Sequence, residues 1–190
     1  MTCPDAAPPA DVESTPPAVW ALSQEQVEAA WDRAEAAQQN ESSTRVENLL
    51  QQQRDLTAYL LEMLAGHDED AAALGLHLLL VAVEAFQAAH PGLKRVRRPA
   101  ILRRHAATLA ILDSLAASPE AGGPPDFAEP ILMELMLGVI GEATPEHQPD
   151  QPDELRLQLL HALWTVSEVL HEAVTAAPGH ALPVMKRRRR

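Results

Sequence analysis

The sequence predicts an all-α protein, a compact bundle of about six mostly antiparallel helices. Its apolar residues are largely Leu, Ala and Val, whereas aromatic residues make up only 3% of the chain. Leu and Ala favour helices, while β-branched and aromatic residues favour strands. Apolar positions recur at three- and four-residue steps, and no segment sustains the period-two alternation of a strand. We expect one helical domain over residues 20–178.

A disordered head over residues 1–19 precedes this domain, because it contains five prolines and no apolar periodicity. The first helix then begins at Ser23. Ser23 and Gln26 have the spacing of a capping box, and Leu22 and Val27 have the positions of a hydrophobic staple. The helical pattern fades near Asn40.

The second predicted helix begins at Thr44, has the strongest amphipathic pattern in the chain and ends at Gly66. The third, over residues 71–89, is apolar nearly all round. A helix covered by its neighbours has this composition, so we expect it to be the most buried element. Its longest apolar run, residues 71–83, is too short to cross a bilayer, which predicts no membrane contact.

Three further helices complete the predicted bundle. The fourth begins near Pro99, since proline suits the first turn of a helix. Five of its apolar residues are expected to face inward: Ile101, Leu102, Leu109, Leu112 and Leu115. The fifth is centred on residues 131–139, and the sixth runs over residues 153–177. Pro- and Gly-rich loops separate these helices. A flexible basic tail over residues 179–190 follows.

Two parts of the chain also show a weak internal sequence similarity. Residues 60–66 resemble residues 132–138, and residues 76–84 resemble residues 160–168. Two duplicated helical hairpins stacked on one another would produce this pattern. Leu-rich helices also resemble one another by chance, so two unrelated hairpins are the alternative.

Charge is distributed unevenly. The net charge is −12, yet eleven of the 15 Lys and Arg residues lie in two clusters, residues 94–104 and 186–190. The remaining surface is therefore acidic and repels nucleic acid and anionic membranes except at these clusters. We interpret eight basic residues as candidate partner-binding positions: Lys94, Arg95, Arg97, Arg98, Arg103, Arg104, Arg187 and Arg188.

Several interpretations of these clusters remain open. The arginines of residues 94–104 could bind phosphates or a carboxylate-rich partner, or could pair with the protein's own Asp and Glu residues. No aromatic residue lies within this stretch for base stacking, so nucleic acid is the less favoured partner. The tail could bind RNA or an acidic surface, or could simply add solubility.

A metal site is a further alternative. His77 and Glu84 are seven residues apart, as are His161 and Glu168, so each pair shares a helix face. Such a site would use six residues, provided that their side chains converge: Glu62, His77, Glu84, Glu134, His161 and Glu168. The sequence also contains Glu168-x-x-His171, the spacing of di-iron bundles, but this arrangement requires a second copy. The more ordinary interpretation is that these residues are structural.

The sequence thus favours a non-enzymatic protein-protein interaction or regulatory module, whose partner is another protein with an acidic surface. A nucleic-acid-associated protein is the alternative, and a metal-dependent helical-bundle enzyme is a second one. No nucleophile elbow or phosphate-binding loop occurs, so no cofactor is expected. The single cysteine, Cys3, and the absence of a signal-peptide pattern predict a cytoplasmic protein. The oligomeric state is not predicted.

Overall fold

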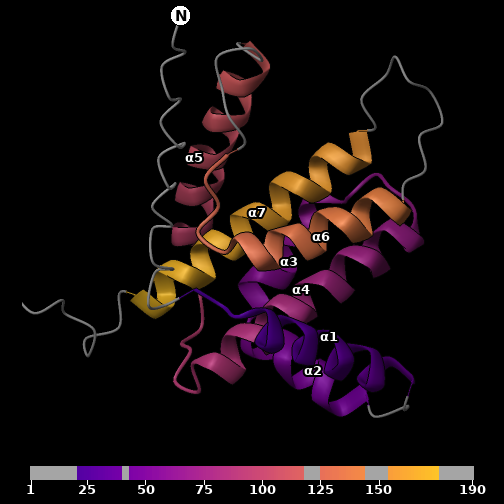
Figure 1. The fold of residues 1–190 in the computed structure, drawn as a ribbon. Coiled ribbons are helices and arrows are strands. Elements are labelled where there is room, and N and C mark those ends of the chain that lie inside the picture. Colours follow the sequence, from indigo (N-terminus) through magenta and orange to yellow (C-terminus); the bar gives the residue numbers. More distant parts are fainter. Residues whose placement is uncertain (1–20, 40–42, 118–124, 144–153, 176–190) are drawn as a thin grey trace, which may run out of the picture.

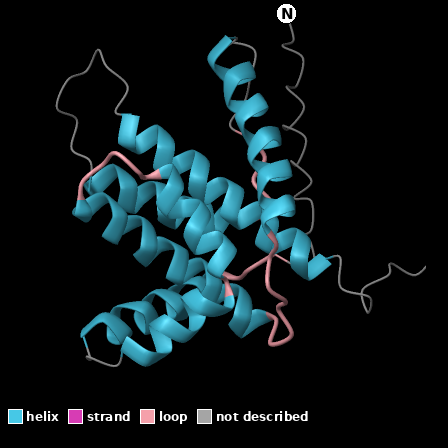
Figure 2. Ribbon diagram, turned by 180° about the vertical axis from the view of Figure 1, so that it is seen from behind, coloured by secondary structure: helices cyan, strands magenta, loops and turns pink. Residues whose placement is uncertain are grey.

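Seven α-helices and no strand make up the described part of the chain (Figures 1 and 2). The structure, a computed structural model, describes residues 21–39, 43–117, 125–143 and 154–175. The predicted Pro-rich head and basic tail lie outside these residues. The helices are, in chain order, α1 (Gln24–Gln39), α2 (Ser43–Gln52), α3 (Arg54–Met63), α4 (Glu69–Ala89), α5 (Arg98–Ala117), α6 (Pro130–Ala143) and α7 (Glu154–Thr175).

Two long helices, α4 and α7, pack against each other in the centre of the bundle. The outer face of α4 is covered by α1, whereas α7 is covered by α5 and α6. The short helix α3 contacts α4, α5 and α7. Helix α2 contacts both α1 and α3. This arrangement confirms the predicted all-α bundle.

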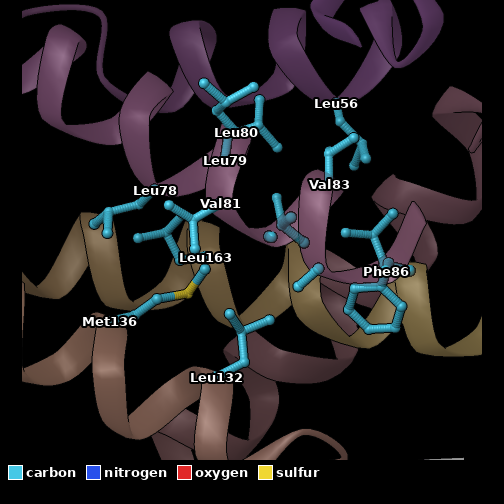
Figure 3. Packing of buried hydrophobic residues seen from close by; sticks show 14 of the residues in the cluster. Leu56, Leu78, Leu79, Leu80, Val81, Val83, Phe86, Leu132, Met136 and Leu163 are labelled. Atoms are coloured by element: carbon cyan, nitrogen blue, oxygen red, sulfur yellow. The ribbon is translucent and has the colours of Figure 1, made fainter. Parts of the chain in front are cut away.

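The core lies where the central helices meet. Val81 of α4 lies beside Leu163 of α7 and Met136 of α6 (Figure 3). The third predicted helix is central and the most buried, as expected, and the sixth is almost as buried. Eleven of the 21 residues of α4 are buried, and eleven of the 22 residues of α7. The physical reason is that α7 has neighbours on three sides, which no periodicity within its own sequence reveals.

The first helix begins as its sequence predicts. The backbone N–H of Ser23 donates to Oε1 of Gln26 at 2.8 Å, and that of Gln26 donates to Oγ of Ser23 at 3.3 Å. Leu22 and Val27 are both buried, as a hydrophobic staple requires. These contacts satisfy N–H groups that would otherwise lack partners at the helix start.

The second predicted helix is broken, so the described residues contain seven helices rather than six. The break lies at Gln53, whose φ of −109° and ψ of 37° are not helical. Its buried side chain accepts a hydrogen bond from the N–H of Val96 at 3.0 Å and donates to the carbonyl of Lys94 at 3.3 Å. The hydroxyl of Thr57 caps the freed carbonyl of Leu50 at 3.2 Å. The break therefore places an amide side chain under the loop before α5.

The predicted inward face of α5 is wrong at two positions. Leu102 and Leu109 are exposed, and Ile101 and Thr108 are the buried residues of this helix. Because α5 packs mainly on α7 and α3, the described part of the bundle covers a narrow stripe of it. Its C-terminal half projects beyond the other helices (Figures 1 and 2). The apolar surface of α5 is thus wider than its contact.

Among the described helices, α4 alone is long and apolar enough to cross a membrane. Most of its apolar stretch, 61%, is buried inside the bundle. The helix is longer than the apolar run 71–83, because further apolar residues follow Glu84 as far as Ala89. The expectation that the chain does not contact a membrane remains a prediction.

The proposed duplication also remains a prediction. In both halves a shorter helix packs on a longer one, α3 on α4 and α6 on α7, and the two longer helices pack together. The two shorter helices, α3 and α6, end at different places relative to the matching sequence, however. Gly66, with a φ of 116°, lies three residues beyond the end of α3, whereas its counterpart Gly138 lies inside α6. The two halves therefore share a pairing pattern but not a common helix boundary.

Candidate functional site

The basic segment before α5 is held by carboxylates of α3. Nη2 of Arg95 lies 2.5 Å from Oδ1 of Asp55. The guanidinium of Arg98 donates two hydrogen bonds to Glu62, each of 2.8 Å, in a bidentate pair. Hydrogen bonds from these arginines lower the pKa of both Asp55 and Glu62. Two of the predicted partner-binding arginines therefore have partners within the protein.

The next two arginines lie on α5 and face α7. Arg104 forms ion pairs with Glu172 and, at 3.5 Å, with Glu168. Arg103 lies 3.3 Å from Glu172, but its side chain remains 70% exposed. Glu168 also accepts hydrogen bonds from the N–H of Ala128 and from the indole of Trp164. This cluster ties α5 to the C-terminal half of α7.

Three of the predicted basic positions keep an accessible charge. Lys94 and Arg97 are exposed, and no carboxylate of the described residues pairs with either. Arg103 is the third. Arg187 and Arg188 lie outside the described residues. The structure thus divides the predicted cluster into paired arginines, which fix the segment, and three accessible cations around the start of α5.

A polar seam, formed by Tyr59, His105, Thr108, His161 and Thr165, lies between α5 and its two neighbours. The hydroxyl of Tyr59 lies 3.0 Å from Nδ1 of His105. Nε2 of His161 lies 3.0 Å from Oγ1 of Thr108, which in turn lies 2.9 Å from Oγ1 of Thr165. The two imidazole rings stack with centroids 4.5 Å apart. Hydrogen bonds thus supplement the apolar packing of Ile101 across this contact.

Burial shapes the protonation of the polar seam. It raises the pKa of Tyr59, so the phenol stays protonated. It is also the main reason that the pKa of His161 is lowered, although the hydrogen bond of this ring to the carbonyl of His105 acts in the opposite direction. Nε2 of His161 lies 3.2 Å from the carbonyl of His105, which can only accept, so this nitrogen carries the hydrogen.

Sequence reasoning did not identify the polar seam. Its signal is the spacing of Ile101, Arg104, His105 and Thr108, which recur at three- and four-residue steps and so share one helix face. The apolar residues of α5 form a second pattern, which predicts a different inward face. Only the facing residues of α3 and α7 make a polar contact favourable, and their identity depends on the tertiary structure.

The convergence that a metal site requires is not found. Among the described residues, no group of three His, Cys, Asp or Glu side chains could hold a metal ion. The six candidate residues take separate places instead. Three of the carboxylates form ion pairs: Glu62 with Arg98, Glu84 with Arg33 and Glu168 with Arg104. The fourth carboxylate, Glu134, is exposed. His77 packs edge-on against Trp31, and His161 belongs to the polar seam.

One pocket of about 590 Å³ lies between α1, α2 and α4. Nε of Arg33 donates to Oε2 of the buried Glu84 at 3.2 Å in its wall. The amides of Asn48, Gln52 and Gln87 line the rest. Since the charges of Arg33 and Glu84 compensate each other, the pocket presents a largely neutral, amide-rich lining.

Large exposed apolar side chains distinguish α5 from the other described helices. Leu102 is 48% exposed, Ile111 42% and Leu109 41%. Only two other large apolar residues of the described segments are comparably exposed, Leu61 on α3 and Leu157 on α7. Helix α5 therefore combines two exposed leucines on one face, Leu102 and Leu109, with the three accessible cations at its start. The sequence matches no protein-family model, and no curated protein or solved structure is significantly similar to it.

Proposed function

We propose that this protein is a non-enzymatic interaction module and that α5 is the element that binds its partner. The observation that supports this most is the exposure of Leu102 and Leu109, which are seven residues apart and so share one face of a projecting helix (Figure 1). Scattered single apolar residues are normal on a protein surface, but several on one element often mark an interaction site.

The partner we propose is another protein that presents a helix with one apolar and one acidic face. An amphipathic helix of this kind can place apolar side chains on Leu102 and Leu109. Its carboxylates can then meet Arg97 and Lys94, which pair with no described carboxylate, and Arg103, which is 70% exposed although it pairs with Glu172. Charge complementarity of this kind mainly speeds association and selects the partner.

Nucleic acid fits α5 less well. A phosphate backbone is bound by accessible cations, and bases are stacked on aromatic rings. Arg95, Arg98 and Arg104 are already paired with carboxylates, and the segment 94–104 contains no aromatic residue. Exposed leucines contribute little to phosphate binding. We therefore propose a protein partner, with nucleic acid as an outcome that the experiment can reveal.

The partner can be identified by crosslinking from α5. A photo-crosslinking amino acid at position 109 should capture a protein in the native cell, whereas the same amino acid at position 61 should not. The two positions are matched, since Leu109 and Leu61 are each 41% exposed. Crosslinking of the same proteins from both positions, or of nucleic acid from position 109, would contradict the proposal.

Binding can be measured directly with a synthetic helical peptide that carries Leu on one face and Glu on the other. We expect Leu109→Glu to weaken its binding by about tenfold or more, because an apolar contact is lost and like charges approach. Leu61→Glu should leave the affinity unchanged. A peptide with Lys in place of Glu should bind less tightly than the Glu peptide. Equal affinity for both peptides, measured by calorimetry at moderate salt, would refute the charge argument.

A further inference from the structure

Helix α5 is attached to the bundle by a small apolar contact and by a set of polar contacts. Ile101 and Thr108 are its only buried residues, compared with eleven in α4 and eleven in α7, and the partly buried Ala100 and Leu112 also pack against the core. Burial of apolar area is the main stabilising contribution in most helix contacts. Here the hydrogen bonds of the polar seam and the Arg104 ion pairs add to a small apolar area. The attachment of α5 therefore depends on the protonation of its polar groups.

His161 fits its surroundings best as a neutral ring. Its Nε2–H has two acceptors on α5, the hydroxyl of Thr108 at 3.0 Å and the carbonyl of His105 at 3.2 Å. A proton added at Nδ1 places a full charge on a buried side chain, which is costly unless the charge is paired. In the docked state, a charged His161 is disfavoured.

The ring of His105 increases this cost. It stacks on His161 with an interplanar angle of 29° and a centroid distance of 4.5 Å, so a charge on one ring opposes a charge on the other. Tyr59 of α3 also faces His105, with its rings in edge contact. Asp113 of α5 favours the charged form of His161, but it is exposed. Arg104 of α5 forms ion pairs with Glu168 and Glu172 of α7.

We propose that mild acid weakens the docking of α5 on α7 and α3 by charging His161, whose ring stacks on that of His105. The bundle of the remaining helices stays folded, because its core lies between α4, α6 and α7. Undocking would change the position of α5 as the binding element. This last consequence rests on the function proposed above, whereas the undocking itself does not.

The direction of the pH effect follows from linkage. The pKa of His161 is lowered in the docked state, so the undocked state binds more protons in mild acid. Docking is then fully stable above the ordinary histidine pKa of about 6.5 and weakens as the pH falls below it. His171 acts in the opposite direction, because Glu129 raises its pKa, but this pair joins α7 to the start of α6 and not to α5.

Hydrogen exchange of the full chain tests the proposal without any partner. Protection of the α5 amides, corrected for intrinsic exchange and expressed relative to α4, should fall by up to about tenfold between pH 7.5 and 5.5. The limit follows from pH 5.5 lying about one unit below the histidine pKa of 6.5. Asp and Glu side chains ordinarily titrate near pH 4, so imidazoles dominate this range. Unchanged α5 protection would overturn the proposal.

Two substitutions separate His161 from the other histidines. His161→Gln keeps a neutral N–H donor near Thr108 and should remove most of the pH dependence. His77→Gln is the matched control, because burial also lowers the pKa of His77 but its ring contacts Trp31 of α1. It should leave the α5 response intact. An equal pH response in wild type and His161→Gln would refute the role of His161.

One measurement on the wild type decides the question if His161→Gln folds poorly. The imidazole signals of His161 and the amide signals of α5 are followed by NMR from pH 7.5 to 5.5. They should change together, with a midpoint below 6.5. If the amide signals of α5 stay constant over the pH range in which His161 titrates, the proposal is overturned. Because no peptide or partner is present, this result is independent of the binding experiments on Leu109.

Discussion

Leu79→Ala is expected to lower the free energy of unfolding by about 2–5 kcal/mol, the range found for leucines deleted from well-packed cores. Leu79 is fully buried on α4, which is covered by α1 on one side and contacts α7 on the other. Neighbours on both sides limit how far the structure can collapse into the cavity. Urea unfolding of the purified protein, followed by circular dichroism, measures the change.

Glu69→Ala is the control on the same helix. Glu69 is exposed in the first turn of α4, and the cap of that helix is Asp68, whose carboxylate accepts the N–H of Ala71 at 2.9 Å. We expect a change within about 0.5 kcal/mol, as for most surface substitutions. Similar losses of stability at residues 69 and 79 would mean that the orientation of α4 is wrong.

Gln53→Leu is expected to destabilise the protein by about 1–3 kcal/mol, the cost of leaving a buried polar group without its hydrogen bond. Leucine is similar in size and favours helix, so neither volume nor propensity predicts a loss. The loss arises because the buried N–H of Val96 and the carbonyl of Lys94 would no longer have the Gln53 amide. Unfolding in urea gives the magnitude, and hydrogen exchange at Val96 gives the location.

Gln51→Leu provides a matched comparison, because Gln51 is an exposed glutamine two residues earlier in α2. It should change the stability by less than about 0.5 kcal/mol. If Gln53→Leu were as stable as the wild type, the hydrogen bonds of Gln53 to Val96 and Lys94 would not contribute to stability.

Leu79 and Gln53 differ in whether the sequence alone predicts their roles. Leu79 lies in a segment that is apolar nearly all round, and this composition alone indicates a helix surrounded by others. Gln53 lies in an amphipathic run with no sequence signal for a break. Its role depends on backbone groups 41 and 43 residues away, which only the folded chain brings together.

The same distinction applies to the candidate site. The basic segment 94–104 is visible in the sequence, but its division into paired and accessible cations is not. Asp55, Glu62 and Glu172 come from other helices, 36 to 69 residues away from the arginines that they bind. The order of charges along a chain does not determine which of them meet.

By itself, the sequence determined the all-α class, the central place of residues 71–89 and the start of the first helix at Ser23. These features depend on local composition and on contacts within a few residues. The tertiary structure alone decided the break at Gln53, the polar seam under α5 and the exposure of Leu102 and Leu109. The physical reason is that a side chain's burial and its hydrogen-bond partners belong to the neighbours that pack on it. For α5 those neighbours are the polar faces of α3 and α7.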